Sequence, residues 1–276
     1  MRIGTGYGSD PGVRPPAVAG LFYPDDPAEL RSWLEGALER ARRRADGRPA
    51  PKALVAPHAG YVYSGDVAAT GYALVERNAA GFRRVLLLGP SHRVPLDGLA
   101  VPRADAFATP LGVVPIDEEM KRVALGCPGV VVDDLPHAAE HSLEVHLPFL
   151  QVVLGGDWTV LPVSVGAAAT ADTARLIESL WGGDETLVVV STDLSHYLDY
   201  ETASERDRRT AAAILDRAPE RIDPYDACGA YPLRGLLRVA REKDLPVECL
   251  DLRNSGDTAG PRDRVVGYGT FSVGSV

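Results

Sequence analysis

Short apolar runs alternate with amphipathic stretches along most of the chain. The apolar runs have the length and composition of buried strands, which we expect at residues 53–56, 85–88, 130–132, 160–165 and 187–190. The stretches between them repeat apolar residues at helical intervals and predict helices near residues 65–78, 117–125, 142–154, 171–181 and 200–217. This alternation is typical of an α/β protein.

Three further segments shape the predicted sheet. Residues 99–114 contain short apolar runs around two prolines and predict short strands rather than a helix. Residues 247–252 and 265–273 predict two strands joined by a Gly-rich turn. Because these strands do not follow the strand–helix alternation, we expect a mixed central sheet flanked by helices.

The N-terminal segment differs from the rest of the chain. Residues 1–24 are rich in Gly and Pro and lack periodicity, whereas Asp26 and Pro27 suit the cap and the first position of a helix. No internal repeat or low-complexity linker divides the sequence. We therefore expect one domain over residues 1–276, in which residues 1–17 form a flexible or surface-lying arm.

Composition excludes several classes of protein. The 276 residues include 29 Lys and Arg against 38 Asp and Glu, a formal net charge of −9, which disfavours a nucleic-acid partner because phosphate binding needs a basic face. Cys127, Cys228 and Cys249 have no CxxC spacing, so neither a disulfide framework nor a zinc ribbon is indicated. No apolar run reaches the length of a signal peptide or of a membrane span. We expect a cytoplasmic protein with no membrane segment.

Three of the six histidines follow predicted strands directly: His58, His92 and His196. In an open α/β sheet, ligands bind outside the carboxyl ends of the strands, so these three side chains are expected to meet in one cleft. For each histidine taken alone, a polar loop residue bonded to the backbone is the alternative. The Gly-rich segments HAGYVYSG and SGDTAG lack the spacing of a Walker loop or of GxGxxG, so no nucleotide cofactor is expected.

Other reactive residues have both a functional and a structural interpretation. Cys228 precedes a predicted helix, whose dipole would favour a thiolate, but it could also be an inert buried cysteine. Asp193 stands three residues before His196 and could orient a ligand or cap a turn. His141 and Glu144 have the spacing of one helical face.

The neighbours of these residues favour structural roles. Glu140 and Glu144 could be an ordinary exposed acidic pair, and His146, just before Pro148, is expected to pack structurally. We expect His137 in a surface loop. The segment does not have the HExxH spacing of zinc proteases.

Seven segments, in order along the chain, resemble the Memo family, including the bacterial members called AmmeMemoRadiSam system protein B. They are PHAGYVYSGDVAATGYA, LLLGPSHRVPLDGLA, TPLGVVPID, EHSLEVHLPFLQ, STDLSHY, CGAYPLRGLL and SGDTAG. The likeness runs from about Val18 to the C-terminus. It implies a single α/β domain similar to the class III extradiol dioxygenases (LigB-like), which are non-haem iron enzymes that open catechol rings.

The resemblance also implies a metal cleft. His58 of PHAGY, His92 of GPSH and Cys228 of CG look like the ligands of one ion. The ring-cleaving dioxygenases use two histidines and a carboxylate; a cysteine is a softer ligand and favours copper(I) or iron(II). We therefore expect one iron(II) or copper(I/II) ion per chain and redox or oxygen-linked chemistry on an unknown small substrate, as in a metal-dependent oxidoreductase.

By the same resemblance, four more residues are assigned to the cleft. Asp193 and His196 of STDLSHY look like its acid and base, and His141 and Glu144 of EHSLEVH look like further catalytic residues. Two alternatives stay open. One is a non-catalytic binding module, since eukaryotic Memo relatives are similar to adaptors that engage phosphorylated receptor peptides; the other is a metal-assisted hydrolase. The bacterial family name implies association with a radical-SAM enzyme and an AMMECR-type protein.

Overall fold

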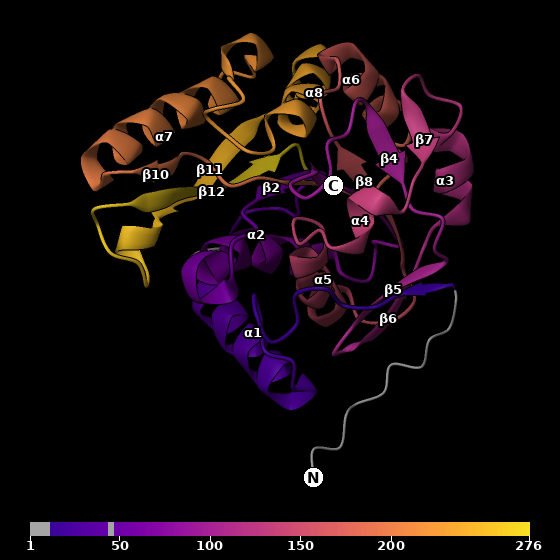
Figure 1. Cartoon of the computed structure of the whole chain (residues 1–276), viewed down its shortest axis with the longest axis horizontal. Coiled ribbons are helices and arrows are strands. Elements are labelled where there is room, and N and C mark those ends of the chain that lie inside the picture. The colour runs from indigo at the N-terminus through magenta and orange to yellow at the C-terminus, as the bar shows by residue number, and fades with distance from the viewer. Residues whose placement is uncertain (1–11, 44–46) are drawn as a thin grey trace.

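The chain folds around one mixed sheet in the computed structural model, which describes residues 12–43 and 47–276 (Figure 1). The strand order is β10, β12, β2, β9, β3, β8, β4, β7, and β11 also pairs with β12. Its strands are β2 (Ala53–Ala56), β3 (Arg84–Pro90), β4 (Leu99–Val101), β7 (Val130–Val132), β8 (Thr159–Val165), β9 (Thr186–Ser191), β10 (His196–Leu198), β11 (Val247–Asn254) and β12 (Val265–Val273). The sheet is mixed because β12 runs antiparallel to β2 and β4 runs antiparallel to β8.

The centre of the sheet is parallel and fully covered. β2, β9, β3 and β8 pair in parallel, and nearly all their residues are buried. A parallel sheet buries both faces, which explains why these strands are continuous apolar runs in the sequence rather than alternating patterns. All five strands predicted from apolar runs are confirmed, within one or two residues at their ends.

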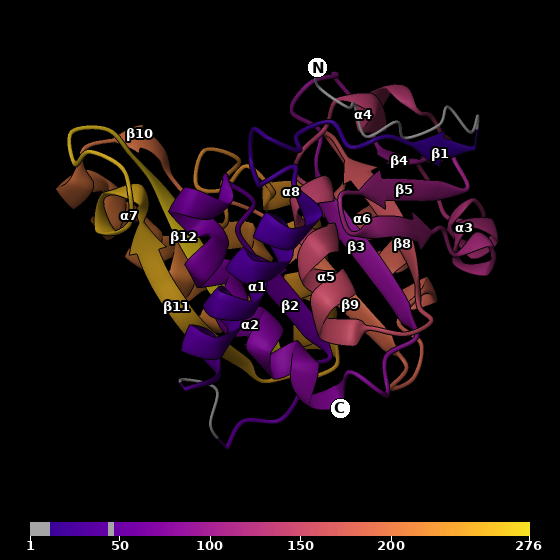
Figure 2. The same cartoon turned by 90° about the horizontal axis from the view of Figure 1, so that it is seen from below.

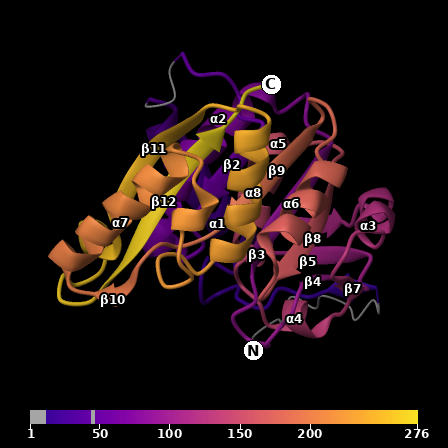
Figure 3. The same cartoon turned by 90° about the horizontal axis from the view of Figure 1, so that it is seen from above.

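Helices cover both faces of the sheet. Figure 2 shows α1 (Pro27–Arg42), α2 (Asp66–Val75) and α5 (Leu147–Leu154) on one face, and Figure 3 shows α6 (Thr170–Ser179), α7 (Tyr200–Leu215) and α8 (Ala230–Glu242) on the other. The shorter helices are α3 (Glu118–Ala124) and α4 (Leu135–Ala138). Among the described helices, none combines the length and apolar composition needed to cross a bilayer. The expected mixed α/β domain with flanking helices is confirmed.

Local sequence explains where α1 begins. The Asp26 carboxylate accepts hydrogen bonds from the backbone N–H groups of Ala28 and Glu29, both at 2.9 Å, and Pro27 occupies the first turn. These bonds satisfy N–H groups that have no partner within the helix. The buried face of α1 includes Leu30 and Leu34, which packs the helix against the core. The helix predicted from Asp26 and Pro27 is confirmed.

The N-terminal arm forms part of a second, smaller sheet. β1 (Val13–Arg14) pairs in parallel with β5 (Ala106–Thr109), which pairs with β6 (Gly112–Pro115). The described part of the predicted arm therefore lies on the body of the protein, while residues 1–11 are outside the described residues. The strands expected within 99–114 are β4, β5 and most of β6, whereas β1, β10 and α4 are not among the predicted elements.

Candidate metal centre

The cleft lies at the carboxyl ends of three parallel strands. His58 follows β2, His92 follows β3 and Asp193 follows β9, each by two residues. Because β2, β9 and β3 are neighbours in the sheet, their ends meet, and the rings of His58 and His92 lie 5.1 Å apart between centroids. The cavity here has a volume of about 500 Å³, and its described lining includes His58, His92, Asp193 and His196. The strand ends thus bring these four predicted residues to one cleft.

Cys228 reaches the same place from the loop before α8. Its Sγ lies 3.3 Å from Nε2 of His58, and its backbone N–H donates to the carbonyl of Asp193 at 3.2 Å. Gly229 makes this approach possible, because a Cβ atom there would lie 2.5 Å from the carbonyl oxygen of Ser191. The potential ligand atoms of His58, His92 and Cys228 all lie within 4.8 Å of one another.

Hydrogen bonds assign the tautomer of His58. Ser191 Oγ donates its only proton to the carbonyl of Ser142 at 2.6 Å, so it can only accept from His58 Nδ1, which is 2.6 Å away. His58 therefore carries its proton on Nδ1 and a lone pair on Nε2. That lone pair faces the sulfur of Cys228.

The same serine is the end of a longer chain of hydrogen bonds. The Tyr72 hydroxyl lies 2.8 Å from Nδ1 of His146, and Nε2 of His146 lies 2.9 Å from Ser191 Oγ. Burial raises the pKa of Tyr72 well above its ordinary value and lowers the pKa of His146 to about 3. Tyr72 thus donates to a neutral His146, which donates to Ser191. His146 packs as expected, and its partners are the groups that orient Ser191.

Glu140 lies against the Nδ1 atoms of His92 and His141, as Ser191 does against Nδ1 of His58. Its Oε1 lies 2.9 Å from Nδ1 of His92 and 3.2 Å from Nδ1 of His141, and its Oε2 accepts the backbone N–H of His92 at 2.6 Å. Burial opposes ionisation of Glu140, but the neighbouring His141 and His92 outweigh it and hold the pKa of the carboxyl well below its ordinary value. The Nδ1–H of His92 donates to this carboxylate, which leaves the Nε2 lone pair of His92 available, whereas Nδ1 of His141 lies beside the same oxygen without a hydrogen bond.

These donors fit a transition-metal ion. One ligand atom each from His58, His92 and Cys228 converges, and both imidazoles are held by a hydrogen bond at Nδ1, which leaves Nε2 for a metal ion. His92, Glu140 and His141 form a second overlapping group with ligand atoms within 4.8 Å of one another. In that group the Glu140 oxygens already accept four hydrogen bonds, so we assign Glu140 to orienting the histidines.

Burial governs the protonation of two of the candidate ligands, His58 and Cys228. It lowers the pKa of His58 well below its ordinary value, an effect reinforced by the neighbouring His92 and His141. Burial, with the nearby Asp193 charge, raises the pKa of the Cys228 thiol. Burial thus opposes the thiolate that the following helix is expected to favour.

Asp193 and His196 lie beside the candidate ligands. Asp193 Oδ1 accepts the backbone N–H of His58 at 2.8 Å, and burial raises the pKa of the Asp193 carboxyl. The Nδ1–H of His196 donates to the carbonyl of Leu194 at 2.8 Å, which leaves Nε2 as an acceptor in the neutral ring. Both residues line the cleft, as does His141, whose ring stacks on His92 at 4.7 Å.

Glu144 lies elsewhere, and the expectation that it shares the cleft with His141 needs correction. The segment that contains it is a 3-10 turn (Glu144–His146) ahead of α5, so the spacing of three does not place the two side chains on one α-helical face. Glu144 is fully buried and pairs with Arg14 of β1. Its oxygens also accept from the Tyr23 hydroxyl and from the backbone of Ala17. The carboxylate anchors the N-terminal arm.

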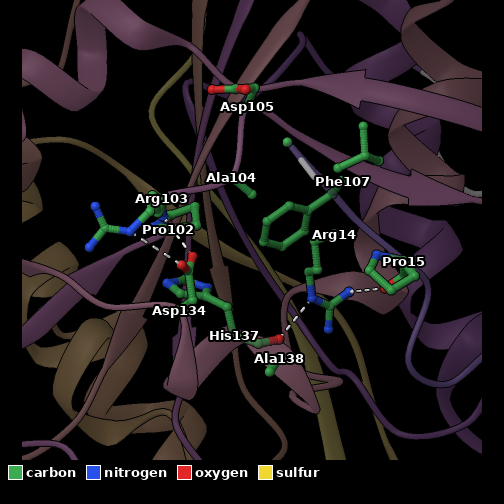
Figure 4. Close-up of a pocket in the computed structure, with 12 residues that line it drawn as sticks. Arg14, Pro15, Pro102, Arg103, Ala104, Asp105, Phe107, Asp134, His137 and Ala138 are labelled. Carbon is green, nitrogen blue, oxygen red and sulfur yellow. Dashed lines mark hydrogen bonds and ion pairs between the residues drawn. The ribbon is translucent and has the colours of Figure 1, made fainter. Parts of the chain in front are cut away.

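His137 also departs from its predicted position. It lies in α4, is 2% exposed, and its Nε2 is 3.0 Å from the carbonyl of Ala100, so it is not a surface-loop residue. Figure 4 shows Arg14 donating from Nε to the His137 carbonyl, in a second cavity of about 600 Å³ that Phe107 also lines. None of the described residues around this second cavity belongs to the candidate ligand set.

Sequence reasoning misses two residues of the centre, Glu140 and Ser191. The sequence presents Glu140 only as one of an acidic pair, although the structure leaves it 1% exposed. Ser191 is the last residue of β9, and its burial is what makes its hydroxyl a fixed partner. In the sequence, Ser191 can be noticed only as a polar residue that ends an apolar strand, close to Asp193 and His196.

The chain is similar to several known proteins. A crystal structure of an uncharacterized protein from Escherichia coli K12 covers 78% of this chain and 98% of that chain, with a TM-score of 0.47 and 13% sequence identity. The MEMO1 family protein of Methanopyrus kandleri is 37% identical over 275 residues, or 92% of this chain and 96% of that protein. The MEMO1 family protein of Aquifex aeolicus is 34% identical over 276 residues, or 93% and 97%. The sequence model of the family described as Memo-like protein matches residues 14–272. This match and the two MEMO1 relatives show that the chain belongs to the Memo-like protein family.

Proposed function

We propose that this Memo-family protein binds one iron or copper ion through His58, His92 and Cys228 and carries out redox or oxygen-linked chemistry on a small substrate in the cleft. The observation that carries the proposal is the convergence of these three ligand atoms within 4.8 Å at the strand ends. Sulfur is a soft donor and imidazole an intermediate one, a combination that suits copper(I) or iron(II) better than magnesium or calcium. When bound, such an ion supplies a Lewis acid and a one-electron redox centre.

The protein residues would bind substrate and move protons. His196 offers Nε2 as a proton acceptor, because Nδ1–H is held by the Leu194 carbonyl. Asp193, whose pKa is raised by burial, is suited to hold a proton and return it to the substrate. Phe22, whose ring lies 4.6 Å from that of His141, adds an apolar group to the lining of the cleft.

The proposal includes a reducing compartment, the cytoplasm. All three cysteines are free, and metal binding needs Cys228 as a reduced sulfur. An oxidised Cys228 could no longer supply the thiolate that binds a metal ion.

Metal content of anaerobically purified protein tests the proposal. We expect near-stoichiometric iron or copper in the parent chain and loss of that metal in His58→Ala and Cys228→Ser, with unchanged far-UV circular dichroism. Cys249→Ser is the matched control, because Cys249 lies in β11 and its sulfur contacts the Asp251 carbonyl rather than the cleft. It should retain the metal.

Three results would contradict the proposal. A parent protein that takes up neither iron nor copper on titration would contradict the proposed metal centre and favour the binding-module alternative. A folded Cys228→Ser variant with full metal content would contradict the assignment of Cys228 as a ligand. A zinc protein whose activity does not depend on oxygen would remove the redox part and favour a hydrolase.

A further inference from the structure

We propose that the cleft binds a small, flat organic acid and that Arg264 binds its carboxylate at the rim. The inference rests on the proposed function, since it names the substrate class of the same cleft. It is carried by the residues that β10, β12 and the loop before β12 contribute to the lining of the cleft.

Tyr197 is held in an unusual backbone conformation at this wall. It is the middle residue of β10, where the pairing with β12 shifts register between His196 and Leu198. Its φ of 61° lies in the left-handed region, which a bulky residue rarely adopts. A β-bulge of this kind redirects side chains, and here both His196 and Tyr197 line the cleft. Strain of this sort is typical of functional sites and persists only where the surrounding fold supports it.

Arg264 stacks on the exposed face of Tyr197. Its guanidinium carbon lies 4.6 Å from the centre of the ring, and both side chains line the cleft. Within residues 12–43 and 47–276, no carboxylate lies within ion-pair distance of Arg264. Stacking occupies the flat face of a guanidinium and leaves the N–H groups at its edge free for a planar anion.

The charge in the cleft favours an acid over a base. Among the described lining residues, Arg264 is the one arginine or lysine, and Asp193, at the floor, is the one carboxylate. An anion would therefore meet a cation at the rim of a protein whose formal net charge is −9. A guanidinium can bind a carboxylate through two parallel hydrogen bonds, which fixes the direction in which the substrate enters.

The remaining walls favour a flat substrate. Phe22, Tyr63 and Tyr268 line the cleft together with Tyr197, so aromatic rings surround the space between the rim and the candidate ligands. Tyr63 and Tyr197 are 41% and 62% exposed, which leaves ring surface for contact with a substrate. A cavity of about 500 Å³ is within the range of small-molecule sites.

Calorimetric titration with three probes of similar shape tests the assignment: benzoate, phenyl phosphate and the neutral benzamide. Metal-free and metal-loaded samples of the full chain are titrated, and their metal content is measured. We expect benzoate to bind at least about tenfold more tightly than benzamide, as a charge-assisted hydrogen-bonded pair would give. Arg264→Ala should reduce benzoate affinity to that of benzamide, and Arg264→Lys should give an intermediate value because it loses the planar fork.

Arg262→Ala is the matched control. Arg262 lies two residues away and also stacks on a tyrosine, Tyr200, at 4.4 Å, but neither residue lines the cleft. This variant should bind benzoate as the parent does. Arg264 is exposed, so its removal is expected to leave the far-UV circular dichroism unchanged.

The outcomes separate this inference from the proposed function. Equal binding of benzoate and benzamide, or equal effects of Arg264→Ala and Arg262→Ala, would overturn the inference even if the protein holds its metal. Tighter binding of phenyl phosphate than of benzoate would overturn the carboxylate assignment. Benzoate selectivity that depends on Arg264 in a chain that takes up no metal would support the acid site and contradict the metal centre.

Discussion

Two buried glutamates, four residues apart, serve different parts of the molecule. Glu140 is 1% exposed and Glu144 is fully buried, and each accepts several hydrogen bonds. The donors to Glu140 include the ring of His92 and the backbone beside it. The donors to Glu144 are the Arg14 guanidinium, the Tyr23 hydroxyl and backbone N–H groups of the arm.

The difference between them shows that burial alone does not identify a functional carboxylate. Both carboxylates accept several hydrogen bonds, but the guanidinium, hydroxyl and backbone donors around Glu144 carry no nitrogen lone pair that could bind a metal ion or accept a proton. The imidazoles around Glu140 keep a second nitrogen free, and both rings line the cleft. A buried carboxylate bonded to histidine therefore indicates a site, whereas one bonded to arginine and backbone is a structural anchor.

Among the variants below, removal of the Glu144 carboxylate should give the largest effect, a loss of stability. In Glu144→Ala the buried Arg14 guanidinium loses its countercharge, and we expect the free energy of unfolding to fall by about 3–5 kcal/mol, measured by urea denaturation. Glu118→Ala is the control, because the Glu118 carboxylate that pairs with Lys121 is exposed and its loss should change little. Unfolding of Glu144→Ala at the same urea concentration as the parent would show that the arm is not anchored this way.

Changing the other glutamate should act on metal affinity instead. Glu140→Gln keeps the shape of the side chain but cannot accept the Nδ1–H of His92 with a full charge, so we expect about 10- to 100-fold weaker metal binding. The affinity is measured by competition with a chelator. A folded Glu144→Gln variant should keep the parent affinity. Equal losses of metal affinity in Glu140→Gln and Glu144→Gln would contradict the separate roles of the two carboxylates.

The pH dependence of metal binding should separate the role of Cys228 from those of Glu140 and His58. Burial raises the pKa of Cys228, so a bound metal must displace its proton at neutral pH, and apparent affinity should rise about tenfold per unit between about pH 6 and 8. The lowered pKa values of Glu140 and His58 mean that neither takes up a proton in that window. Calorimetry in buffers of different ionisation enthalpy should report about one proton released per metal. A flat profile would contradict the sulfur ligand.

The smallest effect is expected at Ser191. Ser191→Ala removes the acceptor for His58 Nδ1–H, and we expect a loss in metal affinity of about tenfold or less. The direct readout is the ¹⁵N spectrum of His58, which should show a single Nδ1–H tautomer in the parent and a mixture in the variant. Ser142→Ala is the control, since its hydroxyl donates to the Pro90 carbonyl. An unchanged tautomer would show that the serine does not set it.

The sequence could predict the parts of the centre that follow from strand order. His58 and His92 come directly after apolar runs, and the ends of parallel strands meet, so their convergence needs no tertiary detail. The same reasoning places Asp193 and His196. The strands and most helices follow from apolar periodicity because the parallel centre is buried on both faces.

Other features depend on contacts between distant segments. Glu144 pairs with Arg14, 130 positions away in a segment that has no periodicity of its own. Glu140 bonds His92 across 48 positions, so its burial could not be inferred from the neighbouring acidic residues. The bulge that turns Tyr197 is a mismatch between β10 and β12, which neither strand carries in its own sequence.

X-ray absorption spectroscopy of the metal-loaded chain identifies the atoms bound to the metal ion. We expect one sulfur and at least two imidazole ligands on a single iron or copper ion, with the sulfur contribution absent in Cys228→Ser and retained in Cys249→Ser. A spectrum of the parent protein that contains only nitrogen and oxygen ligands would contradict the assignment of His58, His92 and Cys228 as the metal centre.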